Sequence, residues 1–82
     1  MYYTYIIYSE SLNRYYTGHT QDIDRRLFEH NRGKTKFAAK GKPWRLVYKF
    51  ESGSRTDAVR LEMKIKKRGA DRFLTDLNSK VC

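Results

Sequence analysis

A stretch of nineteen residues near the N-terminus, YYTGHTQDIDRRLFEHNRG (15–33), concentrates side chains capable of phosphate and proton chemistry. It holds two tyrosines, two histidines and three arginines. Arginine presents a planar fork that matches two oxygens of a phosphate, and histidine gains or loses a proton near neutral pH. The residue types therefore favour a site that holds a phosphate and moves a proton, if the fold brings them together.

A helix is predicted over residues 22–33, and the spacing of its arginines and its histidine places them on different sides of that helix. At about 100° per residue, His30 falls inside the apolar stripe that starts at Ile23, and Arg26 borders that stripe. Arg26 and His30 are four residues apart, so their side chains meet, whereas Arg25 lies on the far side as a surface charge. Taken singly, a surface charge at Arg26 and a structural core histidine at His30 are the simpler interpretations.

Two strands predicted over residues 2–9 and 14–20 precede this helix and form a hairpin. If the turn is residues 10–13, Tyr5 lies opposite Gly18, which leaves open space beside the ring. Because side chains alternate along a strand, one face of the hairpin carries four of these residues: Tyr3, Tyr5, Tyr16 and Gly18. An aromatic cluster packed as core is the plain structural interpretation of this face.

A second helix, predicted from Ser54 to about Lys67, carries one carboxylate among apolar side chains. On the helical wheel, Glu62 lies between two apolar groups. Burying a carboxylate costs free energy unless it is paired or binds a cation. A structural salt bridge to an arginine is one interpretation of Glu62, and a bound cation is the other.

The remaining predicted elements are a basic loop over residues 34–43, a strand over 44–51 and a short helix over 70–78. Alternation in the strand places four apolar residues on one face: Trp44, Leu46, Tyr48 and Phe50. The element order is then β-β-α-β-α-α. It predicts an α+β fold, an α/β sandwich in which helices flank a three-stranded antiparallel sheet, with one domain over residues 1–82.

Composition points to a polyanionic partner. Eighteen Lys and Arg against nine Asp and Glu give a formal net charge of +9. Such an excess favours nucleic acid over a membrane surface. The single cysteine, Cys82, excludes an internal disulfide and a thiolate zinc site, and we expect a cytoplasmic protein without a leader peptide.

Together these residues resemble the GIY-YIG nuclease family, in particular its small stand-alone members. The resemblance rests on Tyr5, on Tyr16-Thr17-Gly18, and on Arg26, His30 and the distant Glu62. It extends over nearly the whole chain. The family's first motif is Gly-Ile-Tyr, whereas this chain has Tyr3-Thr4-Tyr5, so only the tyrosine of that motif is kept.

The resemblance implies hydrolysis of a phosphodiester with one divalent metal, Mg²⁺ or Mn²⁺, on Glu62, and no small-molecule cofactor. Arg26 would clamp the scissile phosphate. The proton acceptor is left open among Tyr5, Tyr16 and His30. A phenol, with a pKa near ~10, would need a nearby cation to serve as a base.

The basic residues around this site would contact the nucleic-acid backbone without reading bases: His19, Lys34, Lys36, Lys40 and Lys42. We expect DNA rather than RNA, cut by structure or under the direction of a protein partner, by a catalytic module alone. A non-catalytic nucleic-acid-binding module is the alternative, and a basic protein-interaction domain is a third. The presence of Glu62 favours the enzyme over the binding module, because a carboxylate would repel the phosphate groups that a binding module holds.

Overall fold

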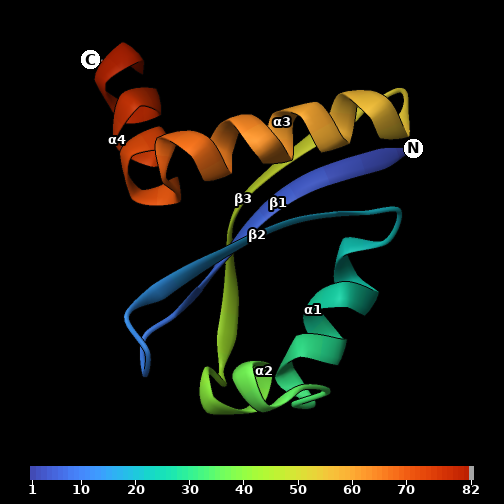
Figure 1. Cartoon of the computed structure of the whole chain (residues 1–82), viewed down its shortest axis with the longest axis vertical. Coiled ribbons are helices and arrows are strands. Elements are labelled where there is room, and N and C mark those ends of the chain that lie inside the picture. The colour runs from blue at the N-terminus through green and yellow to red at the C-terminus, as the bar shows by residue number, and fades with distance from the viewer. Residues whose placement is uncertain (82) are drawn as a thin grey trace.

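The computed structural model describes residues 1–81, with side chains described through residue 78. Cys82 and the expectations about its chemistry lie outside the described residues. The elements, in chain order, are β1 (Tyr2–Ser9), β2 (Arg14–Thr20), α1 (Ile23–Asn31), α2 (Lys36–Lys40), β3 (Trp44–Ser52), α3 (Arg55–Arg68) and α4 (Ala70–Val81). Figure 1 shows the sheet between α3 on one side and α1 with α2 on the other. The predicted α+β class is confirmed.

The sheet is antiparallel and has the order β2-β1-β3, so the first strand is central. Tyr5 pairs with Gly18 and Ile7 with Tyr16, which confirms the predicted hairpin register. Because the side-chain period is two, this register fixes which residues face each helical layer.

The face that carries Tyr5 packs against α1 and the end of α2. Its buried centre is formed by Tyr5, Ile7 and Trp44. Half-buried side chains surround this centre: Leu12, Tyr16, Ile23, Leu27 and Leu46. The predicted hairpin face is therefore correct, and its aromatic residues are in part core.

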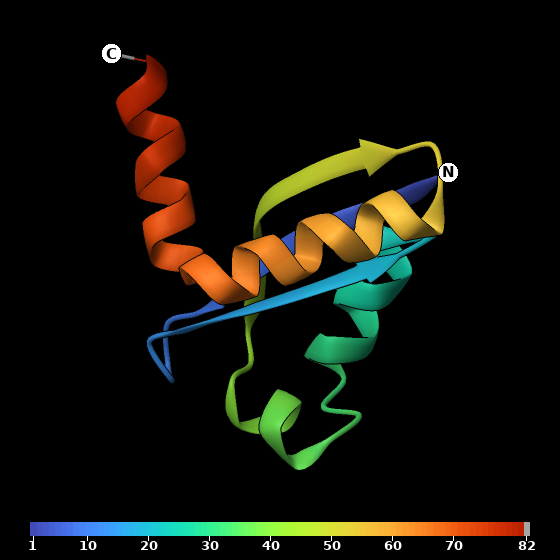
Figure 2. The same cartoon turned by 45° about the horizontal axis from the view of Figure 1, so that its top comes forward.

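The opposite face is covered by α3, which crosses β1 and β2 (Figure 2). Ile6, Ala58 and Ile65 are fully buried between them. The hydroxyl of Thr4 donates to the Ala58 carbonyl at 2.8 Å, which ties the helix to the central strand. This contact fixes the position of α3, the helix that carries Glu62.

The prediction that Trp44, Leu46, Tyr48 and Phe50 share one face of the sheet is wrong, because β3 contains a β-bulge. Ile6 pairs with Tyr48 whereas Ile7 pairs with Leu46, so Val47 is an extra residue between the two pairs. The bulge reverses the side-chain alternation. Leu46 consequently joins the Tyr5 face, while Tyr48 lies on the other face with its ring 5.2 Å from that of Phe73 in α4.

The segment predicted as a basic loop contains a short helix, α2. Thr35 caps it by accepting a hydrogen bond from the Ala38 amide, and Ala38 is buried. The Trp44 indole donates to the Ala38 carbonyl at 2.9 Å. An added Cβ at Gly41 would overlap the Trp44 ring. The helix α2 thus depends on packing against Trp44. This contact could not be predicted from the charge pattern of residues 34–43.

The other helices begin close to where the sequence places them. Asp22 caps α1 by accepting a hydrogen bond from the Arg25 amide, and Ser54 caps α3 by accepting one from the Asp57 amide. Gly69 ends α3 with a φ of 94°, a left-handed conformation that glycine adopts readily. Only α4 is markedly longer than predicted.

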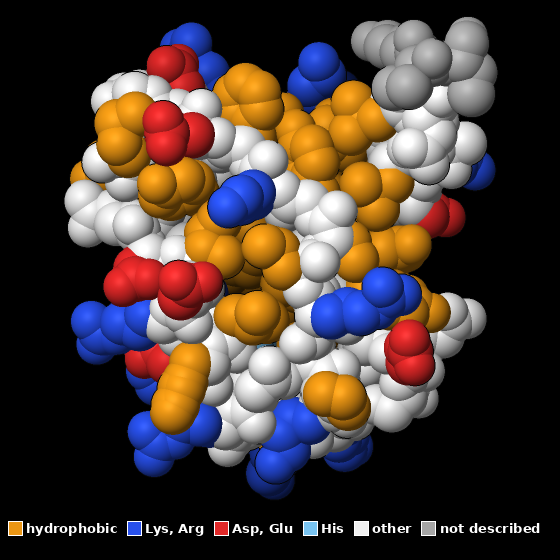
Figure 3. Space-filling model, turned by 180° about the vertical axis from the view of Figure 1, so that it is seen from behind, with side chains coloured by type: hydrophobic (Ala, Val, Ile, Leu, Met, Phe, Trp, Pro, Cys, Tyr) orange, Lys and Arg blue, Asp and Glu red, His pale blue; other side chains and the backbone are white. Residues whose placement is uncertain are grey.

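Figure 3 shows the side away from the view of Figure 1, where hydrophobic side chains gather across the middle and Lys and Arg lie mainly around them.

Candidate active site

Tyr5 reaches the outer edge of the sheet because the residue beside it has no side chain. Tyr5 is only 2% exposed, and an ideal Cβ built on Gly18 would lie 2.7 Å from its hydroxyl oxygen. The phenol therefore lies across β2, an edge strand, over Gly18. The glycine is required here for close packing.

The phenol of Tyr5 is held in its neutral form. Burial raises the pKa of Tyr5 far above the ordinary value for tyrosine, and the fields of Tyr16, Glu62 and Glu29 add to the increase. The Arg26 guanidinium acts in the opposite direction. Tyr5 thus lies within electrostatic range of both Arg26 and Glu62.

Tyr16 and His30 form an aromatic contact between β2 and α1. Their ring centroids lie 4.8 Å apart, and Trp44 packs against both rings edge-on. His30 Nδ1 lies 3.2 Å from the Arg26 carbonyl, which can only accept. When this imidazole is neutral, its Nε2 is consequently the nitrogen that can take a proton.

Glu29 gathers three cations at the surface of α1. Its carboxylate lies 3.3 Å from Lys34 Nζ, 3.9 Å from Arg25 Nε and 4.0 Å from Arg26 Nε. The hydrogen bond from Lys34 is the main cause of a lowered pKa at Glu29. Both neighbouring arginines therefore meet the same carboxylate, although Arg25, at 77% exposure, is largely the surface charge that the helical wheel predicts.

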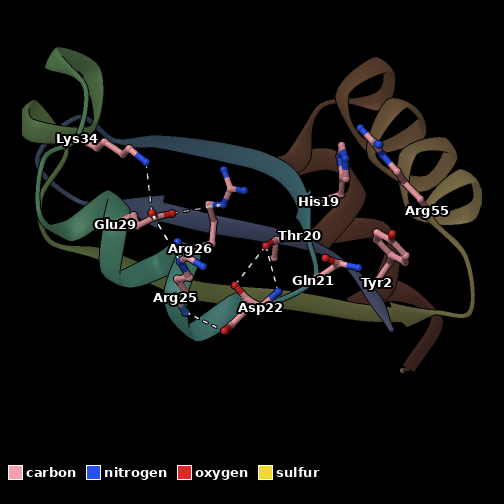
Figure 4. Close-up of a pocket in the computed structure, with 10 residues that line it drawn as sticks. All are labelled: Tyr2, His19, Thr20, Gln21, Asp22, Arg25, Arg26, Glu29, Lys34 and Arg55. Atoms are coloured by element: carbon pink, nitrogen blue, oxygen red, sulfur yellow. Dashed lines mark hydrogen bonds and ion pairs between the residues drawn. The ribbon is translucent and has the colours of Figure 1, made fainter.

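A groove runs along the β2 edge past these residues, and we call it the basic groove (Figure 4). It is lined by Tyr2, His19, Thr20, Gln21, Asp22, Arg25, Arg26, Glu29, Lys34 and Arg55. An adjoining hollow, the aromatic pocket, is lined by Tyr16, Arg26, Glu29, His30, Lys34, Thr35, Phe37 and Ala38. Arg26, Glu29 and Lys34 line both, so the two hollows adjoin at these three residues.

Glu62 lies on the α3 side of the sheet. Its Oε1 is 2.5 Å from His19 Nδ1 and its Oε2 is 2.6 Å from Lys66 Nζ. Burial works to raise the pKa of Glu62, but the hydrogen bonds from Lys66 and His19 outweigh it, so the pKa lies below the ordinary value. The partners of this carboxylate are thus a lysine and a histidine, rather than the arginine of the structural interpretation.

The sequence-derived candidates therefore fall into two groups on opposite faces of the sheet. Tyr5, Tyr16, Arg26 and His30 lie on the α1 side, and His19 and Glu62 on the α3 side. The groups meet at the β2 edge, where His19 lines the basic groove together with Arg26. Glu62 does not line the groove itself and adjoins it through His19.

The predicted basic loop contributes less to the groove than expected. Lys34 is in the lining, whereas Lys36, Lys40 and Lys42 are exposed and absent from it.

Sequence reasoning missed several residues near the site, among them Tyr2, Glu29, Arg55 and Lys66. Two of them had a signal, since Glu29 is four residues after Arg25 and Lys66 is four residues after Glu62, the spacing of helical ion pairs. Tyr2 and Arg55 have no local signal, because only the fold brings them to the groove.

The chemistry of the donor set fits a cation that the substrate helps to hold. Within the described residues, no group of three or more His, Cys, Asp or Glu is placed to hold a metal ion. Mg²⁺, however, is commonly held by one or two carboxylates together with substrate phosphates and water. One oxygen of Glu62 is paired with the Lys66 ammonium, so a bound cation would share or replace this partner.

No helix in the described part of the chain is long and apolar enough to cross a membrane.

Comparison with known proteins identifies related sequences. A family model described as the GIY-YIG catalytic domain matches residues 1–74. The UPF0213 protein of Cronobacter sakazakii (strain ATCC BAA-894) is 47% identical over 55 residues, which cover 66% of this chain and 58% of that protein. The UPF0213 protein of Yersinia pestis (strain Pestoides F) is 44% identical over 52 residues, 62% of this chain and 55% of that protein. The match thus spans little more than half the length of these relatives. No solved structure matches the chain at the stringency applied.

Proposed function

The chain belongs to the GIY-YIG catalytic domain family, and on this premise we propose that it is a metal-dependent endonuclease that hydrolyses phosphodiesters in DNA. The observation that carries the proposal is the β2 edge. There the Tyr5 phenol lies across Gly18, and His19, which lines the basic groove together with Arg26, contacts Glu62 on the other face. The edge thus brings together groups suited to proton transfer and to stabilising negative charge, which can promote phosphodiester hydrolysis.

Arg26 binds the scissile phosphate in this proposal. Its side chain is 46% exposed and lines both the basic groove and the aromatic pocket. A phosphate competes with the Glu29 carboxylate, whose oxygen is 4.0 Å from Arg26 Nε, longer than a hydrogen bond. The guanidinium can therefore turn to the substrate without losing a strong contact.

His30 is the proton acceptor that the geometry supports best. Its Nδ1 is engaged by the Arg26 carbonyl, which leaves Nε2 to accept. Histidine is also suited to proton transfer at neutral pH. Tyr5 and Tyr16 then orient the attacking water, since the raised pKa of the Tyr5 phenol opposes its ionisation.

Glu62 would hold the divalent ion, Mg²⁺ or Mn²⁺, with the substrate phosphate completing the site. Once bound, such an ion supplies stabilisation of negative charge on the leaving oxygen. His19 orients the Glu62 carboxylate through a 2.5 Å contact, and Lys66 balances its charge in the free protein.

The lysines of the 34–42 segment contact the backbone of the substrate, Lys34 from within the groove and the others from the surface beside it. Contacts to the backbone do not distinguish one base sequence from another. We therefore propose that the protein is structure-selective or is directed by a protein partner. We further propose a single domain over residues 1–82, DNA rather than RNA as the substrate, and the cytoplasm as the place of action.

The experiment compares plasmid, branched and single-stranded DNA and matched RNA, each with Mg²⁺, with Mn²⁺ and with chelator. Glu62→Gln and Arg26→Ala should each lower the cutting rate by about 10²-fold or more, the usual cost of removing one charge-stabilising group. Arg32→Ala is the matched control: it removes an exposed arginine at the end of the same helix that lines neither the basic groove nor the aromatic pocket, and it should change the rate by less than about tenfold. Equal cutting by wild type and Glu62→Gln would refute the assignment of the site.

The alternative is a nucleic-acid-binding module without catalysis. One observation favours it, because both oxygens of Glu62 are engaged by His19 and Lys66, which makes the carboxylate a stable structural ion pair. This alternative predicts no cutting with any metal, together with DNA affinity that falls steeply with salt.

A further inference from the structure

Phe37 is an aromatic ring at the rim of the proposed phosphate site. It lies on α2 and is 41% exposed, although phenylalanine gains free energy by burial. Its neighbours in the lining of the aromatic pocket include Arg26, His30 and Lys34. The exposed part of the ring therefore lies beside three groups suited to binding a phosphate.

The inner side of Phe37 rests on a rigid support. Its ring centroid is 5.6 Å from that of Trp44 and 6.4 Å from that of Tyr16. Trp44 is 2% exposed and is held by its indole hydrogen bond to Ala38 and by close contact with Gly41. Phe37 is consequently fixed before any ligand arrives, so little conformational entropy is lost when something stacks on it.

Three lysines lie near Phe37. Lys36 flanks it on α2, Lys34 lies in the same pocket, and Lys40 follows one turn later. An aromatic platform within a basic surface is the arrangement by which proteins bind single-stranded nucleic acid, because bases stack on the ring while phosphates meet the cations.

We propose that Phe37 stacks against an unpaired base next to the phosphate bound by Arg26, and that it is the residue that directs the protein to single-stranded or branched nucleic acid. A base within a duplex is already stacked on both sides and offers no free face to the ring. This inference deepens the proposed function and rests on its nucleic-acid substrate, but it does not depend on catalysis.

Binding is measured by fluorescence anisotropy in the presence of chelator, so that nothing is cut. The probes are a labelled 12-nucleotide single strand, the same strand as a duplex, and an abasic strand with an identical backbone. Phe37→Leu should weaken binding to the single strand by about fivefold or more and change binding to the duplex by less than twofold. Phe37→Tyr keeps the ring and should bind as the wild type does.

The abasic strand separates stacking from other effects. The wild type should bind it as weakly as Phe37→Leu binds the intact strand, and Phe37→Leu should lose nothing further on it. Phe28→Leu is the matched control, since Phe28 is 53% exposed and lines neither the basic groove nor the aromatic pocket. Equal losses on intact and abasic strands, or equal losses from Phe28→Leu, would overturn the proposal.

Folding of the variants is checked through Trp44, the only tryptophan of the chain. An unchanged Trp44 emission maximum in Phe37→Leu shows that the packing beneath residue 37 is intact. If the maximum shifts, the proposal is judged from Phe37→Tyr and from the binding of the wild type to the abasic strand. Selective binding of single strands without any cutting would support the stacking role of Phe37 and refute the nuclease activity. Cutting of DNA without selective binding of single strands would support the nuclease activity and refute the stacking role.

Discussion

Substitution of Gly18 by alanine tests whether close packing at Tyr5 defines the β2 edge. The backbone at Gly18 is not left-handed, so alanine can adopt it. The new Cβ, however, would lie 2.7 Å from the Tyr5 hydroxyl oxygen and 2.9 Å from Cζ, closer than real side chains approach. Because Tyr5 is 2% exposed, its ring has little room to move away.

The expected cost follows from two opposing effects. Overpacking a buried site costs about 1–3 kcal/mol, whereas replacing glycine within a strand gains about 0.5–1 kcal/mol. The net loss in the free energy of unfolding is then about 1 kcal/mol, which lowers Tm by about 4–8 °C in a domain of this size. Displacement of the Tyr5 phenol should also lower the cutting rate.

Thermal and urea unfolding followed by circular dichroism measure this loss. Gly53→Ala is the matched control, because a Cβ there meets nothing within 4 Å. In a Tyr5→Phe background, Gly18→Ala should cost less, since the closest contact is removed while Cζ remains. If Gly18→Ala is as stable as Gly53→Ala, or if the two backgrounds give equal losses, the close-packing argument is wrong.

Two further predictions concern α1. The pKa of Glu29 is lowered in the folded protein, first of all by the Lys34 hydrogen bond. The wild type should therefore be more stable than Glu29→Gln above the unfolded pKa of about 4.3, and this advantage should disappear as pH falls through the lower folded value. A urea series from pH 6 to pH 3 measures it, and a constant difference would contradict the pairing. Asn31 accepts from the Trp44 amide at 2.6 Å and donates to the Trp44 carbonyl at 3.1 Å, so Asn31→Ala should cost about 1–3 kcal/mol in denaturant unfolding. Asn31→Asp keeps the acceptor but sets a carboxylate oxygen against the Trp44 carbonyl, so it should also lose stability; equal stability of all three proteins would show that this link is dispensable.

Local patterns were sufficient for the hairpin and for the starts of α1 and α3. The register of Tyr5 with Gly18 follows from the turn length, and the caps at Asp22 and Ser54 follow from their side chains. These features depend on residues close in sequence. The helical wheel likewise placed His30 on the packed side of α1, where it meets Tyr16.

The features that the sequence did not predict depend on distant contacts. The bulge at Val47 arises from how β3 pairs with β1, and α2 is stabilised by Trp44. The pairing of Glu62 with His19 joins residues forty-three positions apart, on a face opposite to Tyr5. No local periodicity contains that information, so the wheel showed an unusual carboxylate without showing its partner.

The bulge at Val47 also divides β3 into two parts that serve different neighbours. Residues 44–46 support the pocket side through Trp44 and Leu46, whereas residues 48–52 support the side covered by α3 and α4 through Tyr48. Changes at Trp44 or Leu46 should alter the site and leave the C-terminal helices undisturbed, and changes at Tyr48 should do the opposite. A library built on this strand can therefore vary the two parts separately, provided that its length is kept, because removing Val47 would turn one part to the wrong face.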